Sequence, residues 1–233
     1  MVIKRITKQF NKSCVGYNLL SDGDKILVGL SGGKDSLMLL KLLAERSRIY
    51  RPRFNVEALH VVMDNVPYSS DIEYLESFCS SLGVPFHICH ASFDDNSLKS
   101  KCFLCSWHRR KVMFQFAEDN GFNKIALGHH QDDILATLLM NMSFTGDVGT
   151  MSPLTTMDHY NLTIIRPLCL VREDDIREYA HIQMWKEQTR KCPFEDDTQR
   201  KHVGDILRRL LNLNPEVRYN LWHSAEKVWE NGT

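Results

Sequence analysis

Apolar positions along the chain form two kinds of pattern, short continuous runs and helically spaced sets, and the two kinds alternate. The continuous runs predict four strands, at 26–28, 54–63, 84–89 and 124–127. Helical spacing before, between and after these runs predicts five helices, at 1–21, 34–43, 69–82, 107–120 and 132–142. Because strand and helix alternate four times, we expect an α/β fold with a doubly wound parallel sheet.

The pattern changes beyond about residue 145, where helical spacing dominates. A short apolar run predicts one more strand at 162–165, and helices are predicted at 173–184, 198–212 and 215–229. The acidic run Glu173-Asp174-Asp175 suits the positive end of a helix dipole at its start. We therefore expect three parts: an N-terminal helical segment (1–24), an α/β domain (25–170) and a C-terminal helical region (171–233).

Composition narrows the class of protein. The 233 residues suit one large domain, and an apolar fraction of 43% is ample for a core. Basic and acidic residues number 29 each, so global charge neither supports nor excludes nucleic-acid binding. No stretch is long enough to span a membrane and the first residues lack a signal-peptide pattern, so we expect a cytoplasmic protein. Seven cysteines in such a chain favour metal or redox chemistry, or burial, over disulfides.

The segment 31–36, Ser-Gly-Gly-Lys-Asp-Ser, joins the first predicted strand to its helix. Two successive glycines let an anion approach the backbone, and the helix dipole lies behind them. Lys34 adds a cation, whereas Asp35 would repel a phosphate unless a metal ion or another cation intervenes. The segment is not a Walker A loop, because that motif needs Gly where Val28 stands and Ser or Thr where Asp35 stands.

A second candidate group follows the fourth predicted strand, at Gly128-His129-His130 and Asp132-Asp133. Because ligands of such sheets bind at the carboxyl ends of the strands, we expect this group to lie at the same edge as segment 31–36. Capping of the next helix by Asp132 would explain one of the carboxylates. Two histidines and two carboxylates together favour contacts to a nucleotide or Mg²⁺ over a transition metal, because adjacent histidines rarely converge on one ion.

The third group is the pair Cys102 and Cys105, expected just ahead of the 107–120 helix, whose positive end favours thiolates. Zinc, a redox disulfide, an iron–sulfur cluster and coincidence all fit a CxxC pair. No second CxxC exists to complete a zinc site, which leaves Cys192 as the candidate partner, and zinc completed by His108 or His202 as the competing hypothesis. The remaining cysteines are expected in the core: Cys14, Cys79, Cys89 and Cys169.

These groups carry a resemblance to a known family. Segment 31–36 resembles the PP-loop of the ATP-pyrophosphatase superfamily, which splits ATP between its α and β phosphates and adenylates a substrate. The stretch from Gly128 to Asp133 resembles the GHHxDD motif of the tRNA 2-thiocytidine synthetases and of lysidine synthetase. Arg166-Pro167-Leu168 and the three cysteines are similar to the same 2-thiocytidine synthetase family. The resemblance implies an adenine nucleotide alpha hydrolase-like fold and a 4Fe–4S cluster on Cys102, Cys105 and Cys192, with one iron lacking a protein ligand.

The function implied by this resemblance is ATP-dependent thiolation of a tRNA base, with ATP and Mg²⁺ as further cofactors. A carbonyl oxygen, that of cytidine C2, would be adenylated and then replaced by sulfur. The expected catalytic residues are Lys34, Asp35 and Asp132. The expected nucleotide-binding residues are Ser31, Gly32, Gly33, Lys34, Asp35, Ser36, His60, Gly128, His129, Asp133 and Arg166, with the adenine near 59–61. The expected partners are tRNA and a sulfur donor such as a cysteine desulfurase or free sulfide, and a homodimer is one option for the assembly.

Some features depart from this family. The chain is short for its tRNA-modifying members, and Ala136 stands where much of the superfamily has Glu. Basic clusters exist (108–111, 190–191, 200–202 and 208–209), but solvated helix faces would explain them equally well. Two alternatives therefore stay open. One is another adenylating enzyme, either a lysidine-synthetase-like ligase or a small-molecule sulfurtransferase, and the other is a non-enzymatic ATP-binding regulator or redox sensor.

Overall fold

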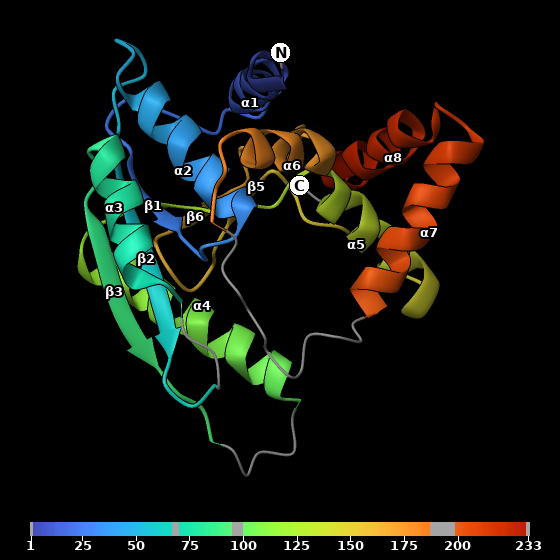
Figure 1. The fold of residues 1–233 in the computed structure, drawn as a ribbon. Coiled ribbons are helices and arrows are strands. Elements are labelled where there is room, and N and C mark those ends of the chain that lie inside the picture. Colours follow the sequence, from blue (N-terminus) through green and yellow to red (C-terminus); the bar gives the residue numbers. More distant parts are fainter. Residues whose placement is uncertain (1, 67–69, 95–99, 187–198, 232–233) are drawn as a thin grey trace.

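The computed structural model describes residues 2–66, 70–94, 100–186 and 199–231. Its centre is one six-stranded sheet of order β3-β2-β1-β4-β6-β5, in which only the last strand runs antiparallel (Figure 1). The strands are β1 (Lys25–Gly29), β2 (Asn55–Met63), β3 (Phe86–Ala91), β4 (Lys124–Ala126), β5 (Leu154–Thr156) and β6 (Thr163–Ile165). The predicted doubly wound parallel sheet is confirmed, with one antiparallel edge strand that the pattern did not predict.

Helices cover both faces of this sheet. They are α1 (Val2–Gly16), α2 (Lys34–Ser47), α3 (Ile72–Leu82), α4 (Lys101–Asp119), α5 (Gln131–Phe144), α6 (Glu173–Ile182), α7 (Gln199–Leu213) and α8 (Val217–Asn231). Ile26 and Val28 of β1 face a core shared with α1, α2, α3 and α6, whereas Leu27 between them faces a core shared with α4. A strand buried on both faces reads as a continuous apolar run, which is why the pattern predicted β1 correctly.

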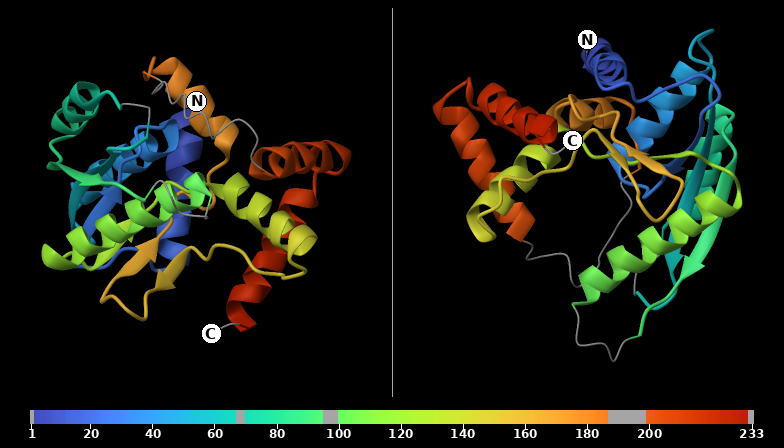
Figure 2. Two further views of the ribbon diagram at one scale, coloured as in Figure 1. Left: turned by 90° about the horizontal axis from the view of Figure 1, so that it is seen from below. Right: turned by 180° about the vertical axis from the view of Figure 1, so that it is seen from behind.

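A third apolar cluster lies beside the sheet, where α7 and α8 pack against α5 (Figure 2). Ile134 and Leu135 of α5 are fully buried, and Leu207 of α7 and Trp222 of α8 are nearly so. The C-terminal helices are therefore fixed to the helix that starts at the GHH segment. The division into parts 1–24, 25–170 and 171–233 stays a prediction.

Two helix boundaries differ from the sequence pattern. Helix α4 begins at Lys101, six residues before the predicted start, because the Ser100 hydroxyl caps it by accepting a hydrogen bond from the Phe103 backbone N–H at 3.3 Å. The pair Cys102 and Cys105 therefore lies inside the helix rather than ahead of it. Helix α1 ends at Gly16, before the predicted end at residue 21, and Val15 in its last turn is 74% exposed although it is apolar.

The cysteines expected in the core have that environment. Cys14, Cys79 and Cys169 are buried, and Cys89 is half-buried against the core shared with α4. Burial raises the pKa of Cys14 to about 12 and that of Cys79 to about 11. Thiols that stay protonated at neutral pH are poor nucleophiles and poor metal ligands, so the assignment of these residues to packing is confirmed.

Candidate functional site

The loops after β1 and β4 meet at one edge of the sheet because these two strands are hydrogen-bonded neighbours. Segment 31–36 turns at Gly32, whose φ of +85° is a conformation that L side chains rarely adopt. Gly128 lies so close to this turn that a Cβ on it would come within 3.1 Å of the Asp35 carbonyl carbon and the Ser36 nitrogen. Two segments about a hundred residues apart thus form one structure, as the pattern predicted.

Hydroxyl groups brace the turn from inside. Ser31 Oγ lies 3.1 Å from Ser36 Oγ, and Ser36 Oγ also donates to the Gly33 carbonyl oxygen at 2.9 Å. Gly33 is the N-cap residue of α2 and offers no side chain to cap its first turn. The first N–H groups of α2 therefore face the turn without a side-chain cap, which is the arrangement that binds a phosphate at a helix N-terminus.

Lys34 lies between two carboxylates at this edge. Its Nζ is 3.1 Å from Asp35 Oδ2 and 3.1 Å from Glu173 Oε1 at the start of α6. Burial works to lower the pKa of Lys34, but the two carboxylates outweigh it and the pKa is raised. The lysine therefore stays charged, and its ammonium group is held beside the turn.

Asp35 has one satisfied oxygen and one that is not. Its Oδ1 is buried and accepts no hydrogen bond within the described part of the chain, and His130 Nε2 lies 3.8 Å from it. Burial raises the pKa of Asp35 despite His130 and Lys34. A buried carboxylate oxygen without a donor, next to a turn built for phosphate, fits a divalent cation such as Mg²⁺ bound together with a nucleotide.

The histidine segment caps α5. His130 Nδ1 accepts from the Asp133 backbone N–H at 3.3 Å, and Asp133 Oδ2 accepts from the His130 N–H at 3.1 Å, which is a reciprocal capping box. The alternative that Asp132 caps this helix is therefore wrong. His130 Nε2 lies 3.8 Å from Asp35 Oδ1, so buried His130, with half-buried His129 before it, lies at the edge where Lys34 and Asp35 meet.

Asp132 instead joins three helices. Its Oδ1 is 2.7 Å from Arg218 Nη2 of α8, and its Oδ2 accepts from the Glu173 backbone N–H at 2.8 Å. Although burial alone would raise the pKa of Asp132, Arg218 outweighs burial and the pKa is lowered. Both carboxylate oxygens are engaged with the protein, so the contacts of Asp132 favour a positioning role over proton transfer.

Two other expected nucleotide-binding residues contact protein groups. His60 is buried on β2, and its Nδ1 lies 2.7 Å from the Leu30 carbonyl oxygen, immediately before segment 31–36. Arg166 follows β6; its Nη1 donates to the Ser152 carbonyl oxygen at 2.5 Å and to Thr155 Oγ1 at 3.1 Å. Burial lowers the pKa of Arg166 to about 10. His60 fastens the start of the turn, and Arg166 fastens the strand β5.

The cysteine pair lies beyond the ends of β2 and β3. Cys102 is exposed, and Cys105 is half-buried against an apolar cluster of Met63, Ala91 and Phe93. The two residues are three apart on the first turn of α4, a spacing that suits ligation of one metal centre. Within the described ranges no group of three or more His, Cys, Asp or Glu could hold a metal ion. Cys192 lies outside the described residues, so the predicted meeting of three thiols stays a prediction.

Three site residues escaped the sequence analysis: Glu173, Arg177 and Arg218. Glu173 was expected only to complement a helix dipole, yet it pairs with Lys34 across the site. Arg177 binds Glu173 at 2.7 Å from one turn further along α6, a spacing of four residues that could have indicated the pair. No pattern in the sequence pointed to Arg218.

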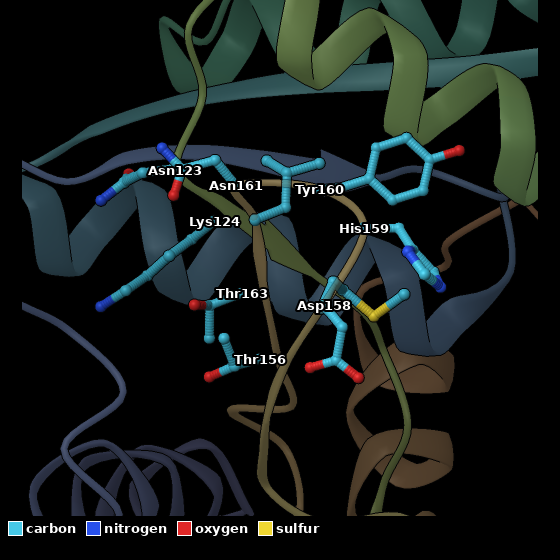
Figure 3. Close-up of a pocket in the computed structure, with 10 residues that line it drawn as sticks. Asn123, Lys124, Thr156, Asp158, His159, Tyr160, Asn161 and Thr163 are labelled. Atoms are coloured by element: carbon cyan, nitrogen blue, oxygen red, sulfur yellow. The ribbon is translucent and has the colours of Figure 1, made fainter.

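A cavity of about 520 Å³ lies at the opposite edge of the sheet, between the start of β4 and the β5–β6 hairpin (Figure 3). Its one lysine, Lys124, extends away from Asp158 and His159 (Figure 3), and its ammonium group binds Asp24 and the Leu19 carbonyl oxygen. The cavity has no converging set of charged groups. The edge that holds Lys34, Asp35 and His130 is therefore the candidate site.

Comparison with known proteins agrees with this site. Residues 2–211 match the family model described as a PP-loop domain, and the chain belongs to this family. The predicted resemblance is confirmed. Among curated proteins, the chain is similar to the tRNA-cytidine(32) 2-sulfurtransferase of Bdellovibrio bacteriovorus, with 37% identity over 96% of this chain and 88% of that protein. The protein of the same name from Legionella pneumophila strain Corby is 32% identical over 97% of this chain and 82% of its own length.

Solved structures give the same result. The chain is similar to the U34-tRNA thiolase NcsA from Methanococcus maripaludis with its [4Fe-4S] cluster, at a TM-score of 0.83 and 28% identity, over 98% of this chain and 80% of that one. An NH3-dependent NAD synthetase from Campylobacter jejuni shares the fold, at a TM-score of 0.52 and 14% identity, over 99% of this chain and 96% of that chain. The predicted fold class is confirmed.

Proposed function

We propose that the chain is an ATP-dependent sulfurtransferase that adenylates a carbonyl oxygen of a tRNA base, most specifically O2 of a cytidine, and replaces it with sulfur. The proposal rests on the geometry of the site together with the family to which the chain belongs. A glycine turn with a charged lysine and an unsatisfied buried carboxylate oxygen lies in a PP-loop chain whose full-length relatives are tRNA sulfurtransferases.

In the first half of the reaction the base oxygen attacks the α-phosphorus of ATP, and the bond to the β-phosphate oxygen breaks, releasing pyrophosphate. The first N–H groups of α2 and the Ser31 and Ser36 hydroxyls would hold the phosphates. Lys34 would stabilise the charge that develops on the departing pyrophosphate. Mg²⁺ would bind Asp35 together with the phosphates and neutralise their charge.

In the second half a sulfur atom bonds to C2 of the base, and AMP departs with the original oxygen. Adenylation makes that oxygen part of a good leaving group, so no strong acid is required at this step. Cys102, Cys105 and Cys192 would hold a 4Fe–4S cluster, whose iron without a protein ligand would supply a bound sulfide. Cys102 and Cys105 fit this role because they lie three residues apart on the first turn of α4, with Cys102 exposed and Cys105 half-buried.

We assign structural roles around the phosphate turn to the remaining expected site residues. His60 and Gly128 would fix the turn, and Asp133 and His129 would shape the edge beside it. The contacts of Asp132 and Arg166 support positioning of α6 and β5 rather than contact with ATP.

The exposed face of α4 supports an RNA substrate. Trp107 is 46% exposed, and Lys111 Nζ lies 5.3 Å from its ring centroid, with Arg110 on the same helix. An exposed indole with flanking cations can stack on a base and bind phosphates. Trp185 cannot serve this purpose, because Phe78 and Tyr179 pack against it with ring centroids 5.6 and 5.5 Å away.

Three further points belong to the proposal. A cysteine desulfurase or free sulfide would supply sulfur, and the chain would act on tRNA in the cytoplasm. A homodimer is an option that oligomeric-state measurements would test. Within the described part of the chain, no helix has the length and apolar character needed to cross a membrane.

The test is to measure pyrophosphate release and 2-thiocytidine formation on unmodified tRNA with anaerobically purified protein. We expect Lys34→Ala to reduce both, and Cys192→Ala to reduce thiolation while ATP binding persists. Cys89→Ala, a change of a half-buried thiol outside the pair, is the control. Undiminished thiolation by Cys192→Ala would remove the three-cysteine site from the mechanism, and zinc in place of iron would favour the ligase alternative. ATP binding without pyrophosphate release on any acceptor would favour a regulator.

A further inference from the structure

We propose that Arg218 of α8 is a positioning residue for ATP, which acts through Asp132 and Glu173 on Lys34 of the phosphate turn. The inference rests on the proposed function in that Lys34 is taken to bind the phosphates of ATP. Arg218 lies beyond residue 211, where the match to the PP-loop family model ends. The role therefore concerns a residue outside the part of the chain that defines the family.

The first link joins α8 to α5. Arg218 Nη2 lies 2.7 Å from Asp132 Oδ1, and Nη1 donates to Gln131 Oε1 at 3.0 Å. The side chains of Arg218 and Asp132 are only 16% and 20% exposed, so water competes weakly for this pair. The guanidinium group thus contacts two successive residues of α5, and its charge-assisted contact holds the Asp132 side chain in place.

The second link joins α5 to α6. The other oxygen of Asp132 accepts from the Glu173 backbone N–H at 2.8 Å, and Glu173 is the first residue of α6. Arg172, the N-cap residue of α6, gives no side-chain cap hydrogen bond, so Asp132 provides a capping acceptor from another helix. The orientation of the first turn of α6 therefore depends on Asp132 staying in place.

The third link reaches the phosphate turn. Glu173 Oε1 lies 3.1 Å from Lys34 Nζ and also 2.7 Å from Arg177 Nη2. When Lys34 moves onto a phosphate, Arg177 still neutralises Glu173, so the exchange leaves no carboxylate uncompensated. Glu173 thus holds the Lys34 ammonium beside the turn until ATP takes it, which reduces the conformational entropy lost on binding.

Most of the residues in these three links line one cavity. A cavity of about 280 Å³ lies between α5, α6, α7 and α8, and Asp132, Glu173, Arg177 and Arg218 all line it. Arg208 of α7 lines the same cavity, but its Nη2 binds Asp205 Oδ1 at 2.7 Å, on its own helix. Arg208 therefore offers a matched control, since it has the same charge and faces the same cavity, and its ion pair within the described part of the chain stays on α7.

The experiment compares Arg218→Gln with Arg208→Gln by following pyrophosphate release against ATP concentration at saturating tRNA. We expect Arg218→Gln to lower kcat/KM for ATP about five- to tenfold and Arg208→Gln to stay near wild type. A separate titration of tRNA at saturating ATP should leave the KM for tRNA unchanged in Arg218→Gln. Arg218→Lys, which keeps the charge and loses the two-pronged contact, should fall between them. Equal losses in Arg208→Gln and Arg218→Gln would overturn the inference.

A second comparison separates positioning from simple attachment of α8. If Arg218 acts through Glu173, Arg218→Gln should cost almost nothing further in a Glu173→Gln background, because the path is already broken. Full additivity of the two changes would contradict the proposed path. Calorimetric ATP binding by the same variants keeps the test independent of thiolation: if wild type binds ATP but releases no pyrophosphate, the proposed function fails, whereas a selective loss of ATP affinity in Arg218→Gln still supports the inference.

Discussion

Two lysines, one at each edge of the sheet, pair with an aspartate, and their surroundings differ. At the amino edge Lys124 Nζ lies 2.7 Å from Asp24 Oδ2, and the two side chains are 10% and 4% exposed. At the carboxyl edge Lys34 Nζ lies 3.1 Å from Asp35 Oδ2, and the side chains are 26% and 28% exposed. The two pairs consist of the same groups, but they differ in how deeply they are buried and in how many hydrogen bonds their carboxylates accept.

The hydrogen bonds of the two carboxylates show this difference. The Asp24 carboxylate also accepts from Asn123 Nδ2 at 2.9 Å and from the Ser21 backbone N–H at 2.6 Å, so both of its oxygens are satisfied. Asp35 Oδ1 is buried and has no donor within the described residues. A saturated buried pair has no capacity left for a ligand, whereas an unsaturated pair at the end of a strand has a place for one. The comparison indicates that the amino-edge pair maintains the fold, and it supports the proposal that the carboxyl-edge pair binds substrate.

The largest effect is expected from breaking the amino-edge pair. Asp24→Ala would leave the Lys124 ammonium buried without its carboxylate, which should reduce the free energy of unfolding by about 3–5 kcal/mol. Denaturant unfolding followed by circular dichroism measures this change. Replacing the other partner of the same pair, with Lys124→Met, should recover part of the loss in the double variant. Wild-type stability of Asp24→Ala would contradict the structural role.

Removing the carboxyl-edge lysine, Lys34, should instead lower activity and leave stability nearly unchanged. Lys34→Met should lower the rate of pyrophosphate release by about 100- to 1000-fold, because a preorganised charge at the phosphates is lost. The unfolding midpoint should change little, since the Asp35 and Glu173 side chains are 28% and 32% exposed and Glu173 keeps Arg177 as its partner. Lys41→Met, on the same helix and paired with Glu45 four residues on, is the control and should leave both measurements near wild type. A large loss of stability in Lys34→Met would erase the proposed contrast.

A smaller effect is expected from crowding the turn. In Gly128→Ala the new Cβ would meet backbone atoms of Asp35 and Ser36 at 3.1 Å, and these atoms must shift. Overpacking of this kind costs about 1–3 kcal/mol, which we expect to appear as weaker ATP binding in calorimetry. Gly16→Ala, where a Cβ meets nothing within 4 Å, should bind ATP as wild type does. Unchanged ATP affinity in Gly128→Ala would show that the turn is not the binding surface.

The sequence predicted the part of this site that depends on local pattern. An apolar run followed by glycines and a helix marks the end of a buried strand, so the positions of segment 31–36 and of Gly128 at one edge followed from the alternation of elements. The contact between Arg218 and Asp132 spans 86 residues and depends on how α8 packs against α5, which no local spacing encodes. The sequence therefore indicated the phosphate turn but not the groups that hold its lysine.

Short elements set the limit for the fold. The three residues of β5 are a strand only because they pair with β6, so their pattern is too short to be recognised alone. The early start of α4 depends on Ser100, a capping signal that was present in the sequence but lay in the polar stretch ahead of the predicted helix. A tertiary partner determines strand β5 and a single capping group determines the start of α4, and the spacing of apolar residues contains neither signal.

The last prediction concerns the pH dependence of stability at the carboxyl edge. Burial raises the pKa of Asp35, so the folded protein binds this proton more tightly than the unfolded chain does, and the contribution of Asp35 to stability falls as the pH rises. For Glu173 burial works in the same direction, but Lys34 outweighs it and the pKa is lowered, so its contribution is present at neutral pH and is lost as the pH falls. Asp35→Asn should therefore gain in melting temperature relative to wild type as the pH is raised from about 4 to 7, and Glu173→Gln should lose over the same range. Thermal unfolding of the three proteins across this range measures both slopes. Slopes of the same sign would mean that the two carboxylates share one environment, and the unsaturated oxygen of Asp35 would then have no energetic consequence for the protein without ligand.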